Sequence, residues 1–447
     1  MRFSQLLCVP LVLWPLSGFA TTLDLPRQPG VFWLQLDALP ERVSNRALSP
    51  DVIHFASLAA LTEYALRTRA ESRAAWLGIQ AEAERLDAAS AANWPTLTGQ
   101  FSFTRNRSLS SSGASVPTLH RYGPSLGLSY VIYDFGARAA GIDAQRYQLI
   151  ATLLTNNRVL QDIISEVETA YFSVLAARAQ GQASREQETS LQTSLDAVNA
   201  RLQGGLVSRA DQLRARATLV ETTLARQASE RDLSKAEAAL KQSTGIAQTR
   251  TLALDWDAAA PTPLDASTLL ADLLDEAVKQ RPDLQALQAS AARARAEADR
   301  ASAARWPSVS LSASTGRTFF VEDERTPSST YSIGVNVSVP IFDGGRLAAT
   351  ARAAARDAER LQADTESQQA QVERTVAEAY YDVRHAQTQR EGITVQFESA
   401  SESAQAAEAR YTAGVGSLLE WLTAQADLAR ARQAVAQADV DCRLSPV

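Results

Sequence analysis

Two acidic residues stand out in this 447-residue sequence because each follows a serine by three positions. Ser208 precedes Asp211, and Ser417 precedes Glu420. A serine followed three residues later by an acid is typical of a helix start, where the two side chains satisfy free backbone amides. The chemistry that these four residues predict on their own is therefore helix capping.

The other reactive residue types do not form a catalytic or metal-binding group in the sequence. His54, His120 and His385 are far apart, and no nucleophile stands beside a base. The glycine-rich stretches lack the lysine and the spacing of a phosphate-binding loop. Cys442 has no partner cysteine outside the first 20 residues, so no intramolecular disulfide is expected. We predict no enzymatic activity, no metal site and no cofactor.

Two stretches each combine a strand that is apolar on one face with a sharp stop. In 332–346, valine and isoleucine alternate with Gly, Asn, Ser and Pro, and Asp343-Gly344-Gly345 follows. The stretch 125–136 alternates in the same way and stops at Asp134-Phe135-Gly136. We interpret Asp134, Gly136, Asp343, Gly344 and Gly345 as strand-to-helix turns.

The two stretches belong to an internal tandem duplication. Matching Asp134 to Asp343 gives an offset of 343 − 134 = 209, which also maps 200–201 onto 409–410 and Gly205 onto Gly414. Upstream, Trp94-Pro95 matches Trp306-Pro307 at an offset of 306 − 94 = 212. The chain is therefore predicted to contain two structural repeats, 51–260 and 261–447, each with a helix, two strands and long helices.

Long helices are predicted between the strands and the glycine turns. A helix is expected over 51–92, and 245–263 is interpreted as a linker. After Gly136 a heptad pattern indicates a coiled-coil seam at Ile150, Leu153, Asn157, Leu160, Ile164, Val167, Tyr171 and Val174. The equivalent seam of the second repeat is weaker, which favours a hollow ring of helices over a solid bundle. The helices turn at Gly204-Gly205 and again at Gly414 and Gly416.

The four predicted strands, each about ten residues long with one apolar face, fit the pattern of outer-membrane barrels. Four strands cannot close a barrel, and open strand edges are not tolerated in lipid, so chains must pool their strands. Two chains would supply eight strands and three would supply twelve, and the sequence does not choose between them. The alternative is a soluble protein in which the apolar faces of the hairpins pack on the helices.

Composition and the N-terminal residues indicate an exported protein. Residues 1–20 carry Arg2, a short apolar run and small residues before Thr21, as a cleaved signal peptide does. Residues 21–50 contain four prolines and are expected to form an extended segment. The net charge of −6, with scattered basic residues, argues against a nucleic-acid partner.

The doubled Trp-Pro, the turn 339–345 and the Tyr411-Thr412-Ala413-Gly414 turn resemble the TolC-like outer-membrane efflux proteins. The resemblance covers residues 51–444. It implies a mainly α protein with a β part, in which a long α-helical barrel joins a transmembrane β-barrel with four strands per protomer. It also implies a homotrimer in contact with outer-membrane lipid, and a location in the outer membrane with the helices in the periplasm.

The resemblance assigns roles to residues at the helix turns. Asp211, Tyr411 and Glu420 match positions of the periplasmic gate and constriction, and Gly204, Gly205, Gly414 and Gly416 lie in turns expected to contact an adaptor. The sequence departs from the family at two positions. Thr423 stands where a second constriction acid is expected, and Gly416 where a gate-linking arginine is expected, so Arg209 and Arg410 are considered as substitutes.

The function implied is that of a passive exit duct of a tripartite efflux or type I secretion system. Its partners would be a periplasmic adaptor (membrane fusion) protein and an inner-membrane pump of the resistance-nodulation-division or ABC type. The substrate is left open between a drug, a metal ion and a secreted protein. The competing hypothesis is a secreted, elongated coiled-coil protein with a structural or adhesive role and no channel.

Overall fold

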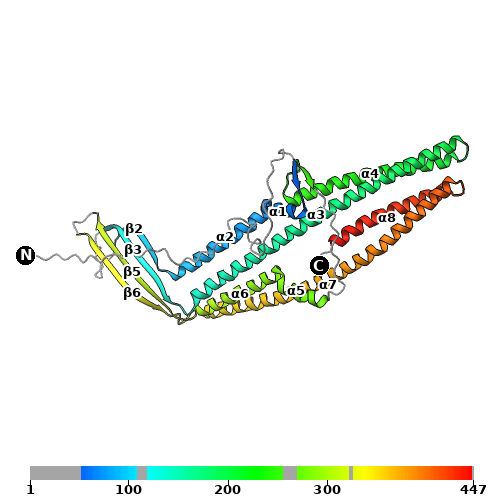
Figure 1. Cartoon of the computed structure of the whole chain (residues 1–447). Helices are drawn as coiled ribbons and strands as arrows, with labels where there is room; N and C mark the ends of the chain where they lie inside the picture. Colours follow the sequence, from blue (N-terminus) through cyan, green and yellow to red (C-terminus); the bar gives the residue numbers. More distant parts are fainter. Residues whose placement is uncertain (1–51, 108–117, 255–268, 322–325, 445–447) are drawn as a thin grey trace, which may run out of the picture.

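The computed structural model of the protein describes residues 52–107, 118–254, 269–321 and 326–444. Three predicted features lie outside the described residues: the signal peptide 1–20, the segment 21–50 and the boundary between repeats at 260/261. The described chain is elongated. A β-sheet lies at one end, two helix turns lie at the other, and long helices run between them (Figure 1).

The larger sheet contains four antiparallel strands in the order β2-β3-β5-β6. Their bounds are β2 Thr96–Asn106, β3 Leu119–Tyr133, β5 Ser308–Phe320 and β6 Ser328–Ser338. Each hairpin comes from one predicted repeat, and the two hairpins join where β3 pairs with β5. Strand β6 ends earlier than the predicted alternation to Ile341, because Pro340 has no amide to donate to a sheet.

The register of the sheet separates apolar from polar residues on opposite faces. Leu97 pairs with Leu128, Leu311 with Val335, and Ala313 with Ile333, so these residues share one face. The other face carries small polar groups. There the Ser314 and Ser332 hydroxyls lie 2.9 Å apart, and the Asn336 amide donates to Ser312 Oγ at 3.1 Å. The sheet is thus apolar on one face only, as the sequence predicts.

Each hairpin passes into a long helix through a glycine turn. Gly136 and Gly345 precede the helices α3 (Ala137–Gln203) and α7 (Arg346–Thr412) with φ angles of 90° and 86°, which favour glycine. Asp343 accepts hydrogen bonds from the amides of Leu347 at 2.7 Å and Gly345 at 2.9 Å. These bonds, first that from Leu347, hold the pKa of the Asp343 carboxyl below its usual value.

The helices α3 and α7 run from the larger sheet to the two helix turns (Figure 1). Each has 67 residues, which corresponds to roughly 100 Å. Helix α3 packs on α2 (Ala70–Ser90) and α6 (Pro282–Ala303) near the sheet, and on α4 (Arg209–Thr244) and α8 (Leu418–Leu444) beyond them. Helix α7 packs on α6 near the sheet and on α8 beyond it. In the part of the chain that the structure describes, no helix has the length and apolar character needed to span a bilayer.

The predicted seam of α3 is correct at Leu160, Val167, Tyr171 and Val174, which are buried. It is wrong at Ile150, which is exposed, while Leu153, Asn157 and Ile164 are only half-buried. The residues that precede Ile150, Asn157 and Ile164 are buried instead, namely Leu149, Asn156 and Ile163. The reason is that α3 packs against different helices along its length, so no single seven-residue line describes its buried face.

A short parallel sheet near the middle of the molecule was not predicted. Strand β1 (Val52–Phe55) pairs with β4 (Thr251–Leu254). The predicted helix over 51–92 therefore begins only with α1 (Leu58–Thr68), and it breaks at Arg69, where the backbone is extended. The predicted linker 245–263 contains β4. Helix α5 (Leu270–Gln280) is the short helix that precedes α6.

Candidate functional site

The two helix turns lie at the same end of the molecule, far from the larger sheet (Figure 1). The first joins α3 to α4. Its chain reversal depends on Gly205, whose φ of 73° favours glycine. The Leu206 amide donates to the Arg201 carbonyl at 2.9 Å and closes the end of α3. Leu206 itself is exposed at the tip.

The second turn joins α7 to α8. Gly414 has a φ of 78°. The amides of Val415 and Gly416 both donate to the Arg410 carbonyl, each at 3.0 Å. A Cβ atom at Gly416 would lie 3.0 Å from the backbone nitrogen of Tyr411. Position 416, where the family resemblance calls for an arginine, is therefore shaped for glycine.

The two acids behave differently. Asp211 forms a complete capping box, because its carboxylate accepts from the Ser208 amide at 3.2 Å while Ser208 Oγ accepts from the Asp211 amide at 3.2 Å. The Ser208 hydroxyl also donates to Asp211 at 2.7 Å. These bonds, the hydroxyl bond first, lower the pKa of the Asp211 carboxyl. Asp211 therefore stays ionised at the start of α4.

Glu420 forms only one half of such a box. Its amide donates to Ser417 Oγ at 3.1 Å, but its carboxylate accepts a hydrogen bond from Arg410 Nη1 at 2.7 Å. Both side chains of this ion pair are largely exposed. Of the two arginines considered as substitutes for the family's gate arginine, Arg410 is thus the one that binds an acid.

Tyr411 is buried beneath the second turn and contacts two residues that the sequence did not indicate. Its ring stacks on Trp421, with centroids 4.9 Å apart. The guanidinium of Arg201 lies over the same ring, 4.4 Å from the centroid. Arg201 also donates to the carbonyls of Tyr411 at 2.9 Å and Thr412 at 2.8 Å. The last turn of α3 is thereby bonded to the last turn of α7.

The structure does not bring Asp211 and Tyr411 together through a hydrogen bond. The Asp211 carboxylate is engaged by Ser208. The Tyr411 hydroxyl is buried and has no hydrogen-bond partner within the described chain, and the same holds for the indole nitrogen of Trp421. Tyr411 therefore acts in this structure through its ring and its carbonyl, while Arg201 supplies the polar link.

An apolar cluster and weaker polar contacts join the two helix hairpins behind the turns. The cluster contains Leu191 and Val198 from α3, Ala215 from α4, and Tyr411, Trp421 and Leu428 from the second hairpin. The polar contacts are longer than those of Arg201. Gln187 donates to the Gln425 carbonyl at 3.5 Å, and Arg432 lies 3.6 Å from Glu186.

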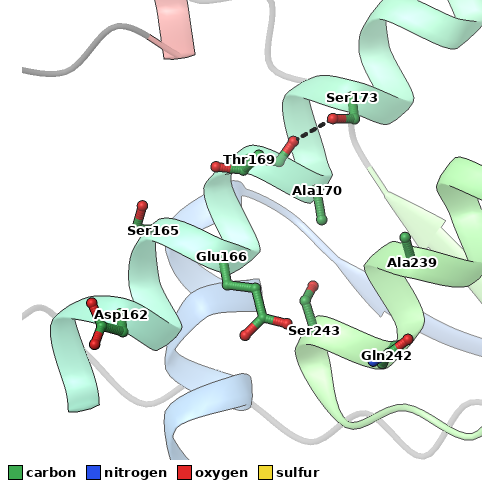
Figure 2. Close-up of a pocket in the computed structure, with 9 residues that line it drawn as sticks. All are labelled: Asp162, Ser165, Glu166, Thr169, Ala170, Ser173, Ala239, Gln242 and Ser243. Atoms are coloured by element: carbon green, nitrogen blue, oxygen red, sulfur yellow. Dashed lines mark hydrogen bonds between the residues drawn. The ribbon is translucent and has the colours of Figure 1, made fainter. Parts of the chain in front are cut away.

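The groove drawn in Figure 2 lies between α3 and α4, away from the turns. It encloses about 500 Å³ and is wide open. Glu166 projects toward α4 (Figure 2) and accepts a hydrogen bond from Arg69 at 2.5 Å. The lining residues are Asp162, Ser165, Glu166, Thr169, Ala170, Ser173, Ala239, Gln242 and Ser243. Among the described residues, no three His, Cys, Asp or Glu side chains could share a metal ion.

Comparison with known proteins adds to this geometry. The model of the outer membrane efflux protein family matches residues 61–246 and 273–443, which is most of the chain. The chain belongs to this family. The outer membrane efflux proteins are transport proteins of the outer membrane rather than enzymes. This chain is therefore an outer-membrane protein with its helical part in the periplasm, as the sequence predicts.

Curated relatives support the assignment. The chain is 29% identical to Protein CyaE of Bordetella pertussis over 371 residues, covering 81% of this chain and 76% of CyaE. It is 27% identical to the outer membrane protein TolC of Escherichia coli over 338 residues, covering 70% of this chain and 65% of TolC. A third relative is the toluene efflux pump outer membrane protein TtgC of Pseudomonas putida, 25% identical over 86% of this chain and 79% of TtgC.

Solved structures share the fold of this outer membrane efflux protein. The outer-membrane channel OprN superposes with a TM-score of 0.76 at 22% identity, covering 87% of both chains. The outer membrane protein VceC of Vibrio cholerae superposes with a TM-score of 0.75 at 19% identity, covering 87% of this chain and 94% of VceC. A long helical part joined to a β part is therefore the shared architecture.

Proposed function

We propose that this protein is a passive exit duct, in which three copies close a twelve-stranded barrel in the outer membrane and extend a helical tunnel into the periplasm. The observation that carries the proposal is the larger sheet. Its apolar face is bare, with Ile333, Val335 and Val337 each at least 60% exposed. A sheet that meets water on one face and lipid on the other has this distribution.

Aromatic residues at both ends of the sheet support a position across a bilayer. At the end near the helices, Tyr133 and Trp306 contact Phe135 with ring centroids 4.8 and 5.6 Å apart. At the far end, Tyr122 stacks on Phe319 at 5.3 Å. Exposed leucine, isoleucine and valine lie between the two groups. Aromatic girdles of this kind flank the apolar band of outer-membrane barrels.

The edges of the sheet support assembly from several copies. Within the described residues, β2 and β6 each pair on one side only. Backbone groups without hydrogen-bond partners are costly in lipid. The free edge of β6 is therefore expected to pair with the free edge of β2 in a neighbouring copy. Three copies supply 3 × 4 = 12 strands, within the known range of such barrels.

The helices carry matching unpartnered faces. On α4, Leu213, Val220 and Leu224 are exposed at steps of seven and four residues. On α7, Tyr381 and Val395 are exposed and lie two heptads apart. A heptad line of exposed apolar residues is the pattern of a coiled-coil seam. In the trimer that we propose, α4 of one copy lies against α7 of the next and covers both faces.

The turns at the periplasmic end are proposed as the gate and the adaptor contact. Leu206 and Val415 lie at the two tips and are 77% and 73% exposed. They occupy equivalent positions in the two repeats, 209 residues apart. Bare apolar side chains on tight glycine turns suit the tip of a helical hairpin from an adaptor. Adaptor binding there would shift the hairpins from a closed to a dilated state. The energised partner is an inner-membrane pump of the resistance-nodulation-division or ABC type.

The test is chemical cross-linking in intact cells, followed by purification of the chain and identification of the captured proteins. Capture of an adaptor together with a pump supports the exit duct, and the pump class indicates the cargo. Heat-resistant trimers in the outer-membrane fraction support the barrel. Soluble elongated dimers without an inner-membrane partner would overturn the proposal in favour of a coiled-coil structural protein.

A further inference from the structure

The duplication equates two arginines, Arg201 and Arg410, that have different partners in the structure. Each lies in the last turn of a 67-residue helix, 209 positions apart. Arg410 stays within its own hairpin and binds Glu420. Arg201 leaves its hairpin and binds the end of α7. The difference breaks the symmetry of the two repeats at the tip.

The contact of Arg201 has three components that act together. Two hydrogen bonds reach the carbonyls of Tyr411 and Thr412 at 2.9 and 2.8 Å, and the guanidinium plane covers the Tyr411 ring at 4.4 Å. The carbonyls at the end of a helix lack intrahelical partners and carry the negative end of the helix dipole, so a cation there is favoured. The planar guanidinium bonds two acceptors at once, which an ammonium cannot do in the same geometry.

Arg201 makes the shortest of the polar contacts between the hairpins that the structure describes. The other contacts, through Gln187, Ser190 and Arg432, measure 3.4 to 3.6 Å. The apolar cluster around Trp421 also holds the hairpins together, but apolar contact is not directional and permits sliding. A two-bond guanidinium contact fixes one relative position.

We propose that Arg201 is the latch that fixes the first helix hairpin to the second in the closed duct. The inference rests on the proposed function, in which the two helix hairpins separate when the gate opens. Arg201 is the residue that holds these hairpins in position until then. When the hairpins part, both bonds and the ring contact break together. The Tyr411 hydroxyl and the Trp421 indole nitrogen, which are buried without hydrogen-bond partners among the described residues, then gain access to water.

The test compares Arg201→Gln with Arg201→Lys and with a matched control, Arg185→Gln. Arg185 lies on the same helix, but its bond, at 3.3 Å, is to Glu230 of its own hairpin. The purified proteins are reconstituted in planar bilayers, and the resting conductance is measured. We expect Arg201→Gln to raise the resting open fraction about tenfold, Arg201→Lys to raise it less, and Arg185→Gln to leave it unchanged.

A second measurement tests the role of Arg201 independently of whether the protein is an exit duct. Spin labels at Leu206→Cys and Val415→Cys, in a Cys442→Ser background, report the distance between the two tips. The latch predicts a broader, longer distance distribution in Arg201→Gln than in Arg185→Gln, measured well below the melting temperature of either variant. An unchanged distribution overturns the latch. A protein that forms no pore overturns the exit duct, while the distances still decide the role of Arg201.

Discussion

Arg410 donates a hydrogen bond to the carboxylate of Glu420 at 2.7 Å, across the turn that joins α7 to α8. The family resemblance suggested Glu420 as a member of an acidic ring in the proposed pore. The ion pair places one positive charge beside each negative charge. With Thr423 in place of a second acid, the ring would be nearly neutral in the resting protein.

Removal of the positive charge of Arg410 beside Glu420 should change the ion selectivity of the proposed pore. Arg410→Gln leaves Glu420 uncompensated, so the reconstituted pore should become several-fold more cation-selective. Glu420→Gln should shift selectivity toward anions. Reversal potentials in a salt gradient measure both changes. An exposed ion pair of this kind contributes no more than about 1 kcal/mol to stability, so both variants should still fold. Equal reversal potentials for the two variants would show that Glu420 does not face the ion path.

The Tyr411 hydroxyl offers a test of how this residue acts. Because the hydroxyl is buried without a partner in the described chain, Tyr411→Phe should be neutral or stabilising. Tyr411→Ala removes the ring beneath Arg201 and Trp421 and should destabilise by about 3–5 kcal/mol. Chemical unfolding measures both changes. A loss of more than about 1 kcal/mol in Tyr411→Phe would reveal a partner for the hydroxyl.

The second turn should tolerate no side chain at two of its glycines. Gly414→Ala places a Cβ at a positive φ and should cost about 1–2 kcal/mol. Gly416→Ala should also destabilise, because the Cβ would lie 3.0 Å from the Tyr411 backbone nitrogen. Gly78→Ala is the control, since a Cβ there meets nothing within 4 Å and α2 gains a better helix former. Melting temperatures that fall equally in all three variants would contradict this account of the turn.

The capping box at α4 predicts a pH dependence. The folded-state pKa of Asp211 is lowered, so its contribution to stability is present above the unfolded pKa of about 3.9 and is lost as pH falls through the folded value. Asp211→Asn should therefore melt below the unmodified protein at pH 7, and the difference should shrink toward pH 3. A difference that is constant with pH would mean that the charge of Asp211 is not what stabilises the turn.

The sheet and the long helices could be predicted because local patterns specify them. Period-two alternation marks the faces of the strands, and Asp343-Gly344-Gly345 marks the start of α7. The β1–β4 pair could not be predicted, because two four-residue strands pair across nearly 200 residues, as Val52 does with Thr251. So short a segment carries too little pattern to separate it from the neighbouring helix.

At the candidate site, Asp211, Tyr411 and Glu420 could be named from the resemblance, and the capping partner of Asp211, Ser208, could be named from its spacing. The partners of the Tyr411 ring and of the Glu420 carboxylate could not be predicted. Arg201 and Arg410 occupy equivalent positions in the repeats, so local sequence does not tell them apart. Packing decides that Arg410 binds an acid in its own helix hairpin, whereas Arg201 binds backbone carbonyls in the other hairpin. Trp421, whose ring stacks on Tyr411, has Gln212 as its counterpart in the first repeat. Alignment of the two repeats shows this difference, so it was a signal in the sequence that the two turns are packed differently.

Helices α3 and α7 have the same number of residues, 67, between the glycine that starts each and the turn that ends it. One added residue in either helix would advance that tip by about 1.5 Å and rotate it by roughly 100°. Arg201 would then face away from the Tyr411 carbonyl. Changes in the length of this protein are therefore expected to be paired, with equal insertions in both halves and in steps of about seven residues.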